Sequence, residues 1–170
     1  MAAELLLPRL EYEPSYGAYI QELGAEVRYP FPLDFEHKDF GALLRRLDDF
    51  ANGRNLPAGF VPSSTYWLVE GGEILGVSNL RHHLNDRIRH CGGHIGLGVR
   101  PSYRGRGFGN LLLALTIQEA RKQGIGQLHI HCHKSNTASA RMIARNGGAL
   151  DSEVSDEMEV IQRYLVAPVA

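Results

Sequence analysis

Residues 99–113 read VRPSYRGRGFGNLLL, and this stretch decides the fold that we expect. An apolar strand pattern ends at Val99, a helical pattern begins at Gly107, and a glycine-rich turn from Arg104 to Gly109 joins them. Glycine allows positive φ angles and close approach of a ligand. The first N–H groups of a helix lack intrahelical partners and lie at the positive end of its dipole. The turn therefore predicts a phosphate or pyrophosphate cradle, to which Arg104 and Arg106 add charge; an ordinary turn with solvated arginines is the alternative.

Two familiar phosphate motifs do not fit this turn. The dinucleotide fingerprint requires G-x-G-x-x-G, but Asn110 stands where the third glycine belongs, and no acidic residue follows near position 130. A P-loop requires Gly-Lys-Ser/Thr at the end of the turn, and that triplet is missing here.

Outward from the turn, apolar periodicity alternates between helix and strand. We expect a hairpin turn at 70–73 and at most one helical turn within 84–90. The expected helices cover 15–26, 37–51, 107–123 and 136–145, and the expected strands cover 4–7, 65–69, 74–81, 94–99, 127–132, 149–154 and 159–166. This order favours an α/β fold in which helices cover a mixed sheet, and we expect a single domain over residues 1–170.

The composition narrows the classes of partner. With 170 residues, a net charge of −1 and an isoelectric point near 6.7, the chain has no general attraction to nucleic acid or to an anionic membrane. Its two cysteines do not suggest a disulfide framework or a zinc site. The start, MAAELLLPRL, lacks the basic region of a signal peptide, and no apolar run approaches the ~20 residues that span a bilayer. We therefore expect a soluble, cytoplasmic protein.

Two motifs in order give the chain a family resemblance. Arg104-x-x-Gly107-x-Gly109, directly after the strand, resembles the acyl-coenzyme A signature of the GNAT (Gcn5-related) N-acetyltransferases. Asn136-x-x-Ser139-Ala140, followed by a helix ending in NGG at 146–148, resembles the second motif of that family. Stretches such as TYWLV, GGHIG and VRPS also resemble a poorly characterised bacterial subgroup of predicted acetyltransferases, over roughly residues 60 to 166.

The resemblance implies a GNAT-like fold, with a largely antiparallel central sheet, a splayed strand pair and flanking helices. It also implies acetyl-coenzyme A as cosubstrate, and no metal. By position it assigns the pyrophosphate to the backbone of Gly105, Arg106, Gly107, Phe108 and Gly109. It assigns the pantetheine amides to the backbone of Leu97, Gly98 and Val99, and contacts with the cofactor arm to Asn136 and Ser139.

Several of these positions have structural alternatives. Gly96 and Gly98 suit close approach of a ligand, but also a tightly packed neighbouring strand. Asn136 suits a helix N-cap, and both roles can coexist. Ser139 could approach the pantetheine or simply pack.

Catalysis in enzymes resembling this one is direct attack of an amine on the thioester, which requires a base. His94 is our first choice, because it shares a strand face with Gly96 and Gly98 and its ordinary pKa of ~6.5 suits proton transfer. A histidine that bonds a loop or core neighbour is the alternative, and His83 and Glu70 are reserves. The row His129, His131 and His133 predicts a polar, partly solvated strand face rather than a metal site.

The family pattern is broken at the leaving group. Seven residues after the motif asparagine, many members carry a proton-donating tyrosine, whereas this chain carries Ile143. The helix start at Asn136, Tyr164, Tyr103 or water could serve instead. Candidates for the acceptor pocket are Tyr66, Trp67, Arg81, His82, His83 and Asn85.

We therefore predict acetyl transfer to a primary amine of a small molecule. The alternatives are a protein or peptide amine as acceptor, a longer acyl group, and a catalytically weak acyl-CoA sensor. The sequence leaves a homodimer open.

Overall fold

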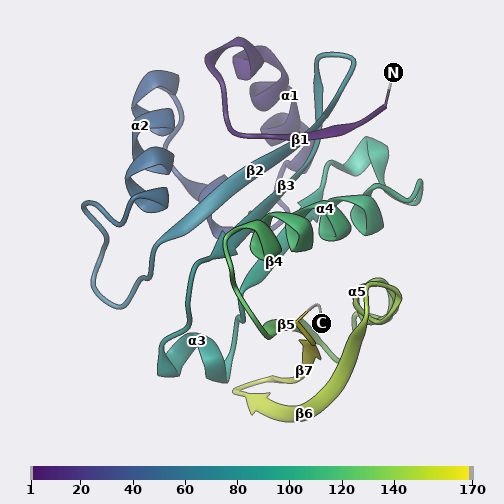
Figure 1. Ribbon diagram of the computed structural model, residues 1–170. Coiled ribbons are helices and arrows are strands. Elements are labelled where there is room, and N and C mark those ends of the chain that lie inside the picture. The colour runs from purple at the N-terminus through teal and green to yellow at the C-terminus, as the bar shows by residue number, and fades with distance from the viewer. Residues whose placement is uncertain (1, 169–170) are drawn as a thin grey trace.

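A computed structural model describes residues 2–168 and shows two antiparallel sheets that meet at an angle (Figure 1). The first sheet has the order β1-β2-β3-β4, built from Glu4–Leu6, Ser63–Glu70, Glu73–Arg81 and Ile95–Val99. The second has the order β5-β7-β6, built from Leu128–His133, Glu159–Val166 and Gly148–Asp156. The prediction of a largely antiparallel α/β fold is confirmed.

Five α-helices accompany the sheets among the described residues: α1 Glu13–Leu23, α2 Phe40–Ala51, α3 Asp86–His90, α4 Phe108–Lys122 and α5 Thr137–Arg145. Short 3₁₀ turns lie at Leu10–Tyr12, Phe31–Asp34 and Pro101–Tyr103. Every predicted helix and strand is present, and the differences are at their ends. Helix α1 ends before the predicted residue 26, because Gly24 takes a φ of 53°. Helix α2 begins later than predicted, because the side chain of Asp39 caps it at the N–H of Ala42, 3.0 Å away.

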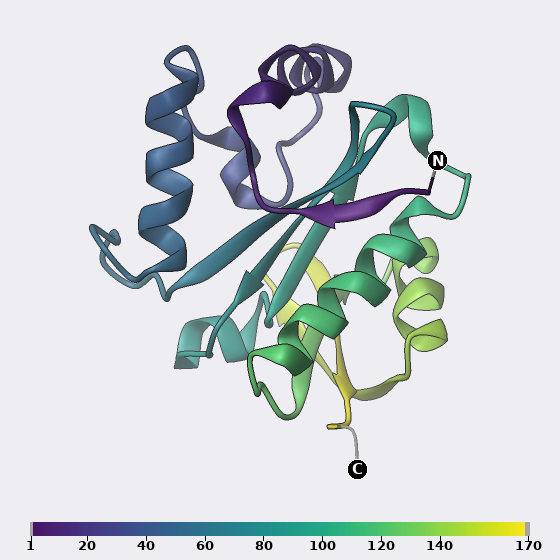
Figure 2. The ribbon, with the colours of Figure 1, turned by 45° about the horizontal axis from the view of Figure 1, so that its top comes forward.

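Helices cover both faces of the first sheet, with α1 and α2 on one face and α4 on the other (Figure 2). Alternate residues of β2 serve the two faces: Trp67 packs with α1 and α2, whereas Leu68 packs with Leu112 of α4. In α4, the buried residues are Leu112, Leu113, Thr116, Ile117 and Ala120, whereas Leu111 and Leu115 are only partly covered.

The two sheets meet where β4 and β5 begin. The N–H of His94 donates to the carbonyl of His129 at 2.7 Å, and Gly93 forms an isolated bridge with Ile130. Beyond this point no ladder joins the strands among the described residues, and each continues in its own sheet. The predicted splayed pair is therefore confirmed, and it opens a space along one edge of β4.

The hydrogen-bond pattern of β4 decides which groups face this opening. Arg100 N–H donates to Leu75 of β3 at 2.8 Å, so the even-numbered residues direct their backbone groups toward β3. Because the direction alternates along an antiparallel strand, Leu97 and Val99 direct theirs toward the open edge.

Candidate active site

A groove of about 520 Å³ runs from the glycine-rich turn along the open edge of β4. It unites nine of the eleven residues predicted to bind the cofactor: Leu97, Gly98, Val99, Arg104, Gly105, Gly107, Gly109, Asn136 and Ser139. Arg106 and Phe108 are not part of its lining. The groove is completed by Tyr103, a candidate for the leaving-group acid, and by residues that the sequence did not single out: Tyr19, Leu23, Glu26, Val27 and Tyr29 from the N-terminal third, with Asn110, Ala138, Met142 and Arg145.

The turn has the backbone geometry of an anion cradle. Gly105 and Gly107 have φ angles of 74° and 85°, and a Cβ on either would meet nothing within 4 Å. No backbone N–H from Gly105 to Asn110 donates to another group of the described residues, and Gly107 directly precedes the 15-residue helix α4. Free N–H groups at a helix N-terminus fit a phosphate or pyrophosphate.

The two arginines of the turn are already engaged by protein groups. Arg104 donates from Nε to the carbonyl of Val99 at 2.9 Å and binds both carboxylate oxygens of Glu26, at 3.1 and 2.8 Å. The same hydrogen bonds lower the pKa of Glu26. Arg106 lies over the rings of Tyr103 and Phe108, 5.3 and 5.5 Å from their centroids. Arg104 therefore brings its charge to the groove together with a carboxylate, and Arg106 is held beside it.

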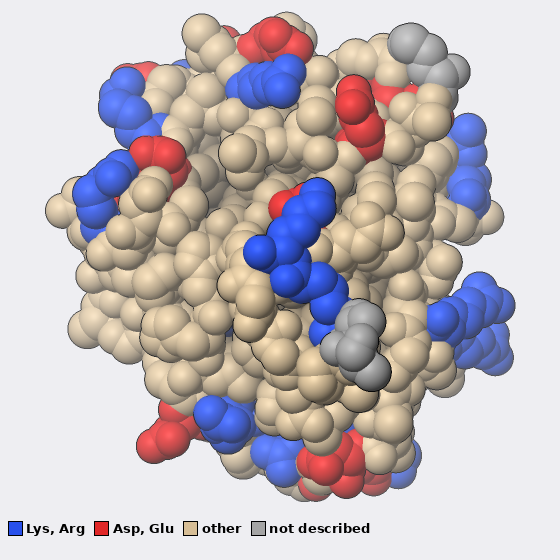
Figure 3. Space-filling model, in the orientation of Figure 1, with Lys and Arg blue, Asp and Glu red and all other residues tan. Residues whose placement is uncertain are grey.

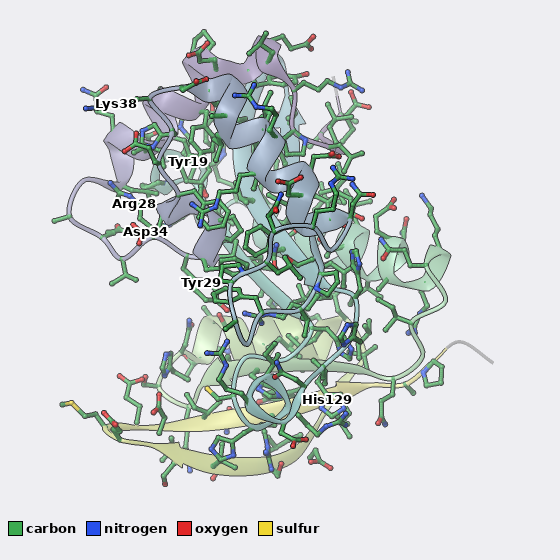
Figure 4. The ribbon with its side chains drawn as sticks, turned by 90° about the vertical axis from the view of Figure 1, so that its left-hand side faces the viewer. Tyr19, Arg28, Tyr29, Asp34, Lys38 and His129 are labelled. Atoms are coloured by element: carbon green, nitrogen blue, oxygen red, sulfur yellow. The ribbon has the colours of Figure 1, made fainter. Side chains whose placement is uncertain are left out.

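The close approach at Gly96 and Gly98 is made by the chain itself. A Cβ at Gly96 would lie 2.9 Å from the Tyr29 hydroxyl, and one at Gly98 would collide with the Tyr29 carbonyl. This face of the two glycines is therefore covered by the Tyr29–Pro30 segment, which is not the neighbouring strand of the alternative. Gly98 also lines the groove, so its role in binding the cofactor remains a prediction. Tyr29 precedes Pro30 through a cis peptide bond and lies, like Tyr19, on the N-terminal part of the chain (Figure 4). The sequence signal for this segment was its proline-rich stretch, YPFP.

Asn136 and Ser139 form the cap of α5. The Asn136 Oδ1 accepts the N–H of Ser139 at 3.1 Å, as its alternative role required, and both residues also line the groove. The capping and groove-lining positions are thus combined at the start of one helix.

His94 lies outside the groove. It is buried, and its Nδ1 accepts the backbone N–H of His129 at 2.9 Å. Burial, and next the nearby His129, lower the pKa of His94 to about 4. Since a backbone N–H can only donate, Nδ1 holds the engaged lone pair and Nε2 carries the proton of the neutral ring. The base role of His94 remains a prediction, and this hydrogen bond is the observation against it.

A second hollow, of about 510 Å³, contains His94. It is lined by His82, His83, Leu84, Arg89, His94, residues 123–127 and His129. Other acceptor candidates serve the fold instead. Tyr66 and Trp67 are buried, Arg81 donates to the Gly93 carbonyl at 2.9 Å, and Asn85 caps α3.

Of the two tyrosines that could act as the leaving-group acid, only one lines the groove. Ile143, at the usual tyrosine position, is 1% exposed and packs in the core, and Gly148 lies so close to Ile143 that no side chain could be added to it. Tyr164 donates its hydroxyl to Gln162 at 3.0 Å, outside the groove, whereas Tyr103 lines it.

The histidine row on β5 ranges from His131, which is buried, through His129, which is partly exposed, to His133, which is exposed and pairs with Glu159. Within residues 2–168 there is no group of three or more His, Cys, Asp or Glu side chains arranged to hold a metal.

The helices in this same range include none with the length and apolar character to cross a bilayer. On the face shown in Figure 3, acidic and basic side chains are interspersed, with no broad field of one sign.

Comparisons with known proteins agree with this geometry. The family model of the acetyltransferase (GNAT) family matches residues 25–148. A structure of RimL, described as a ribosomal L7/L12 α-N-protein acetyltransferase in complex with coenzyme A, matches with a TM-score of 0.73 and 15% identity, covering 99% of this chain and 95% of that one. The ribosomal-protein-S5-alanine acetyltransferase of Vibrio fischeri matches with a TM-score of 0.73 and 13% identity, covering 99% and 94%. MccE, a microcin C7 self-immunity acetyltransferase solved with acetyl-CoA and AMP, matches with a TM-score of 0.70 and 16% identity, covering 97% of this chain and 92% of that one. No curated protein sequence matches the chain significantly.

Proposed function

The chain belongs to the GNAT family of acetyltransferases, and from this premise we propose that it transfers the acetyl group of acetyl-CoA to a primary amine of a small molecule. Attack takes place directly, with both substrates bound at once. The observation that carries the proposal is the groove, because it joins the free N–H groups of residues 105–110 to the open edge of β4.

The groove suits the extended shape of the acyl donor. The pyrophosphate would lie on the N–H groups between Gly105 and Asn110, and the amides of the pantetheine arm would bond the outward backbone groups of Leu97 and Val99. Acetyl-CoA supplies an activated carbonyl at the far end of that arm. The amine nitrogen attacks the carbonyl carbon, the C–S bond breaks, and its electron pair leaves on sulfur.

The second hollow is our candidate site for a small polar acceptor. Its volume of about 510 Å³ lies within the range of small-ligand sites, roughly 300–1,000 Å³. Arg89 and His83 at its border could hold a carboxylate on the acceptor. Arg89→Ala is then expected to raise the KM for the amine, while the affinity for acetyl-CoA stays unchanged.

The role of His94 is tested by the pH dependence of turnover. A base with a pKa near 4 would be unprotonated over the whole neutral range, so turnover would fall only near pH 4 rather than near pH 6.5. His94→Gln should abolish this acidic limb if His94 is the base. An unchanged profile, recorded as kcat/KM against pH, would assign the base elsewhere.

A protein amine is the second candidate acceptor. It is favoured by the similarity to RimL and to the S5-alanine enzyme, both described as acting on ribosomal proteins. Titration with acetyl-CoA by calorimetry, followed by thiol release with matched panels of small amines and N-terminal peptides, decides between the two. Turnover on peptides alone would replace the small-molecule proposal, and tight binding without turnover on either panel would indicate a sensor.

A further inference from the structure

His131, in the middle of β5, has a buried hydrogen-bond donor without a partner. The residue is 9% exposed, and its Nε2 is the one buried side-chain nitrogen or oxygen of residues 2–168 that makes no hydrogen bond. Its Nδ1 accepts the backbone N–H of Gly92 at 3.0 Å. Because that N–H can only donate, the proton of the neutral ring is on Nε2. A buried donor left unpaired costs free energy, so its position calls for a physical reason.

The surroundings of His131 point to a ligand that fills the splay. The residue lines a cavity of about 40 Å³ between the diverging strands β4 and β5. Tyr29, Leu97 and Ser139 line this cavity and also the groove, so the cavity adjoins the path of the acyl donor. Its other walls include the apolar side chains of Ile95, Ile130 and Ile143.

We propose that the Nε2–H of His131 donates a hydrogen bond to the carbonyl oxygen of the bound acetyl group and stabilises the negative charge that develops there. The inference rests on the proposed function, since it requires acetyl-CoA in the groove. The oxygen is the better partner, because a thioether-like sulfur accepts hydrogen bonds only weakly. Burial, followed by the nearby His129, lowers the pKa of His131 to about 4, which keeps the ring neutral and Nε2 a donor at neutral pH.

His131 keeps the same protonation state throughout the reaction. As the amine nitrogen bonds to the carbonyl carbon, the π pair moves onto the oxygen that His131 faces. That pair returns to form the amide carbonyl when the C–S bond breaks and its electrons leave on sulfur. The surplus proton passes from nitrogen, through water, to the departing sulfur, so the products are the amide and the thiol of coenzyme A. The Nε2 proton stays on the ring. The cavity of about 40 Å³ exceeds the ~10–15 Å³ that one water molecule needs, so it has room for a small group such as acetyl.

The test compares the affinities for acetyl-CoA and for coenzyme A, which lacks the carbonyl. In His131→Leu, calorimetry should show acetyl-CoA affinity lowered by about 5- to 10-fold and coenzyme A affinity nearly unchanged. Turnover should fall by roughly 100-fold, the typical effect of losing one oxyanion donor. His131→Gln, whose amide N–H₂ can reach the Nε2 position, should recover the preference for acetyl-CoA and part of the turnover.

His133→Leu is the matched control, because it changes an exposed histidine on the same strand face and should leave both affinities unaltered. Equal losses for the two ligands in folded His131→Leu, or no loss, would overturn the proposal. A wild-type protein that bound neither ligand would instead refute the proposed function. If His131→Leu does not fold, the Nε2–H resonance of ¹⁵N-histidine-labelled wild type decides: a downfield shift with acetyl-CoA but not with coenzyme A supports the bond, and equal shifts exclude it.

Discussion

Glu26 sets the charge of the groove at its phosphate end. Its carboxylate holds the Arg104 guanidinium through two hydrogen bonds, and it also lines the groove where an anionic ligand would bind. The carboxylate therefore both repels the ligand and competes for the arginine. The pair is exposed to solvent, so salt should screen its effect.

Glu26→Gln should therefore raise the affinity for coenzyme A by about 3- to 10-fold at low salt, and by less at high salt. Calorimetric titrations at the two salt concentrations measure this change. The control is Glu153→Gln, which removes a comparable exposed carboxylate on β6 from its ion pair with Lys134. Unchanged or weaker binding in Glu26→Gln would mean that the ion pair positions Arg104 for the ligand.

Gly107 offers a second test at the scale of one residue. Its φ of 85° strains any other residue by about 1–2 kcal/mol, but a Cβ there has open space. Gly107→Ala should thus lower the free energy of unfolding by that amount. Gly107→Glu adds a negative charge at the cradle and should weaken coenzyme A binding on the order of 10-fold beyond the alanine variant. Equal affinities of the two variants would place the phosphates elsewhere.

At the scale of elements, the N-cap residue of α5 lies at a position that serves the helix and also faces the groove. Asn136 caps the helix and also lines the groove. Asn136→Ala should lower the free energy of unfolding by about 1 kcal/mol, whereas Asn136→Ser should keep the cap and most of the stability. If the Asn136 side chain also binds the cofactor arm, both variants should bind acetyl-CoA more weakly. Restoration of affinity by serine would leave capping as the sole role.

Elements were predictable because each depends on residues close in sequence. The 3.6-residue pattern of α4 and the glycine turn before it lie within one stretch, as do the cap and helix that begin at Asn136. The same holds for most of the groove lining, since the turn, β4 and α5 each bring their own motif.

Contacts between distant segments could not be predicted in this way. Tyr29 covers Gly96 and Gly98 from a proline-rich segment without periodicity, and the choice between a ligand and a packed chain needed that contact. The base role given to His94 depended on a strand face, but its lone pair is engaged by His129, 35 residues away. Arg104 likewise meets Glu26 across 78 residues.

At the scale of the whole molecule, two buried histidines lie where the two sheets meet. His94 and His131 both lie there, each accepting a backbone N–H at Nδ1, and each with its pKa lowered to about 4, chiefly by burial. The pKa of each is thus lower in the folded chain than in the unfolded one, where it is about 6.5. Between these values the unfolded chain binds more protons, so the free energy of unfolding must fall as pH decreases through this window.

We expect a loss of about 3–5 kcal/mol between pH 7 and pH 4.5 for the two rings together, measured by urea unfolding at a series of pH values. The carboxylates with lowered pKa values, such as Glu22 and Glu73, take up protons only below pH 4.5, so their contribution to stability is lost mainly below that window. The double variant His94→Gln/His131→Gln should have a flatter pH dependence, whatever its absolute stability. A wild-type free energy of unfolding that stays constant over this range would mean that the two rings take up protons without separating the sheets, and the junction would then be more open to water than its burial indicates.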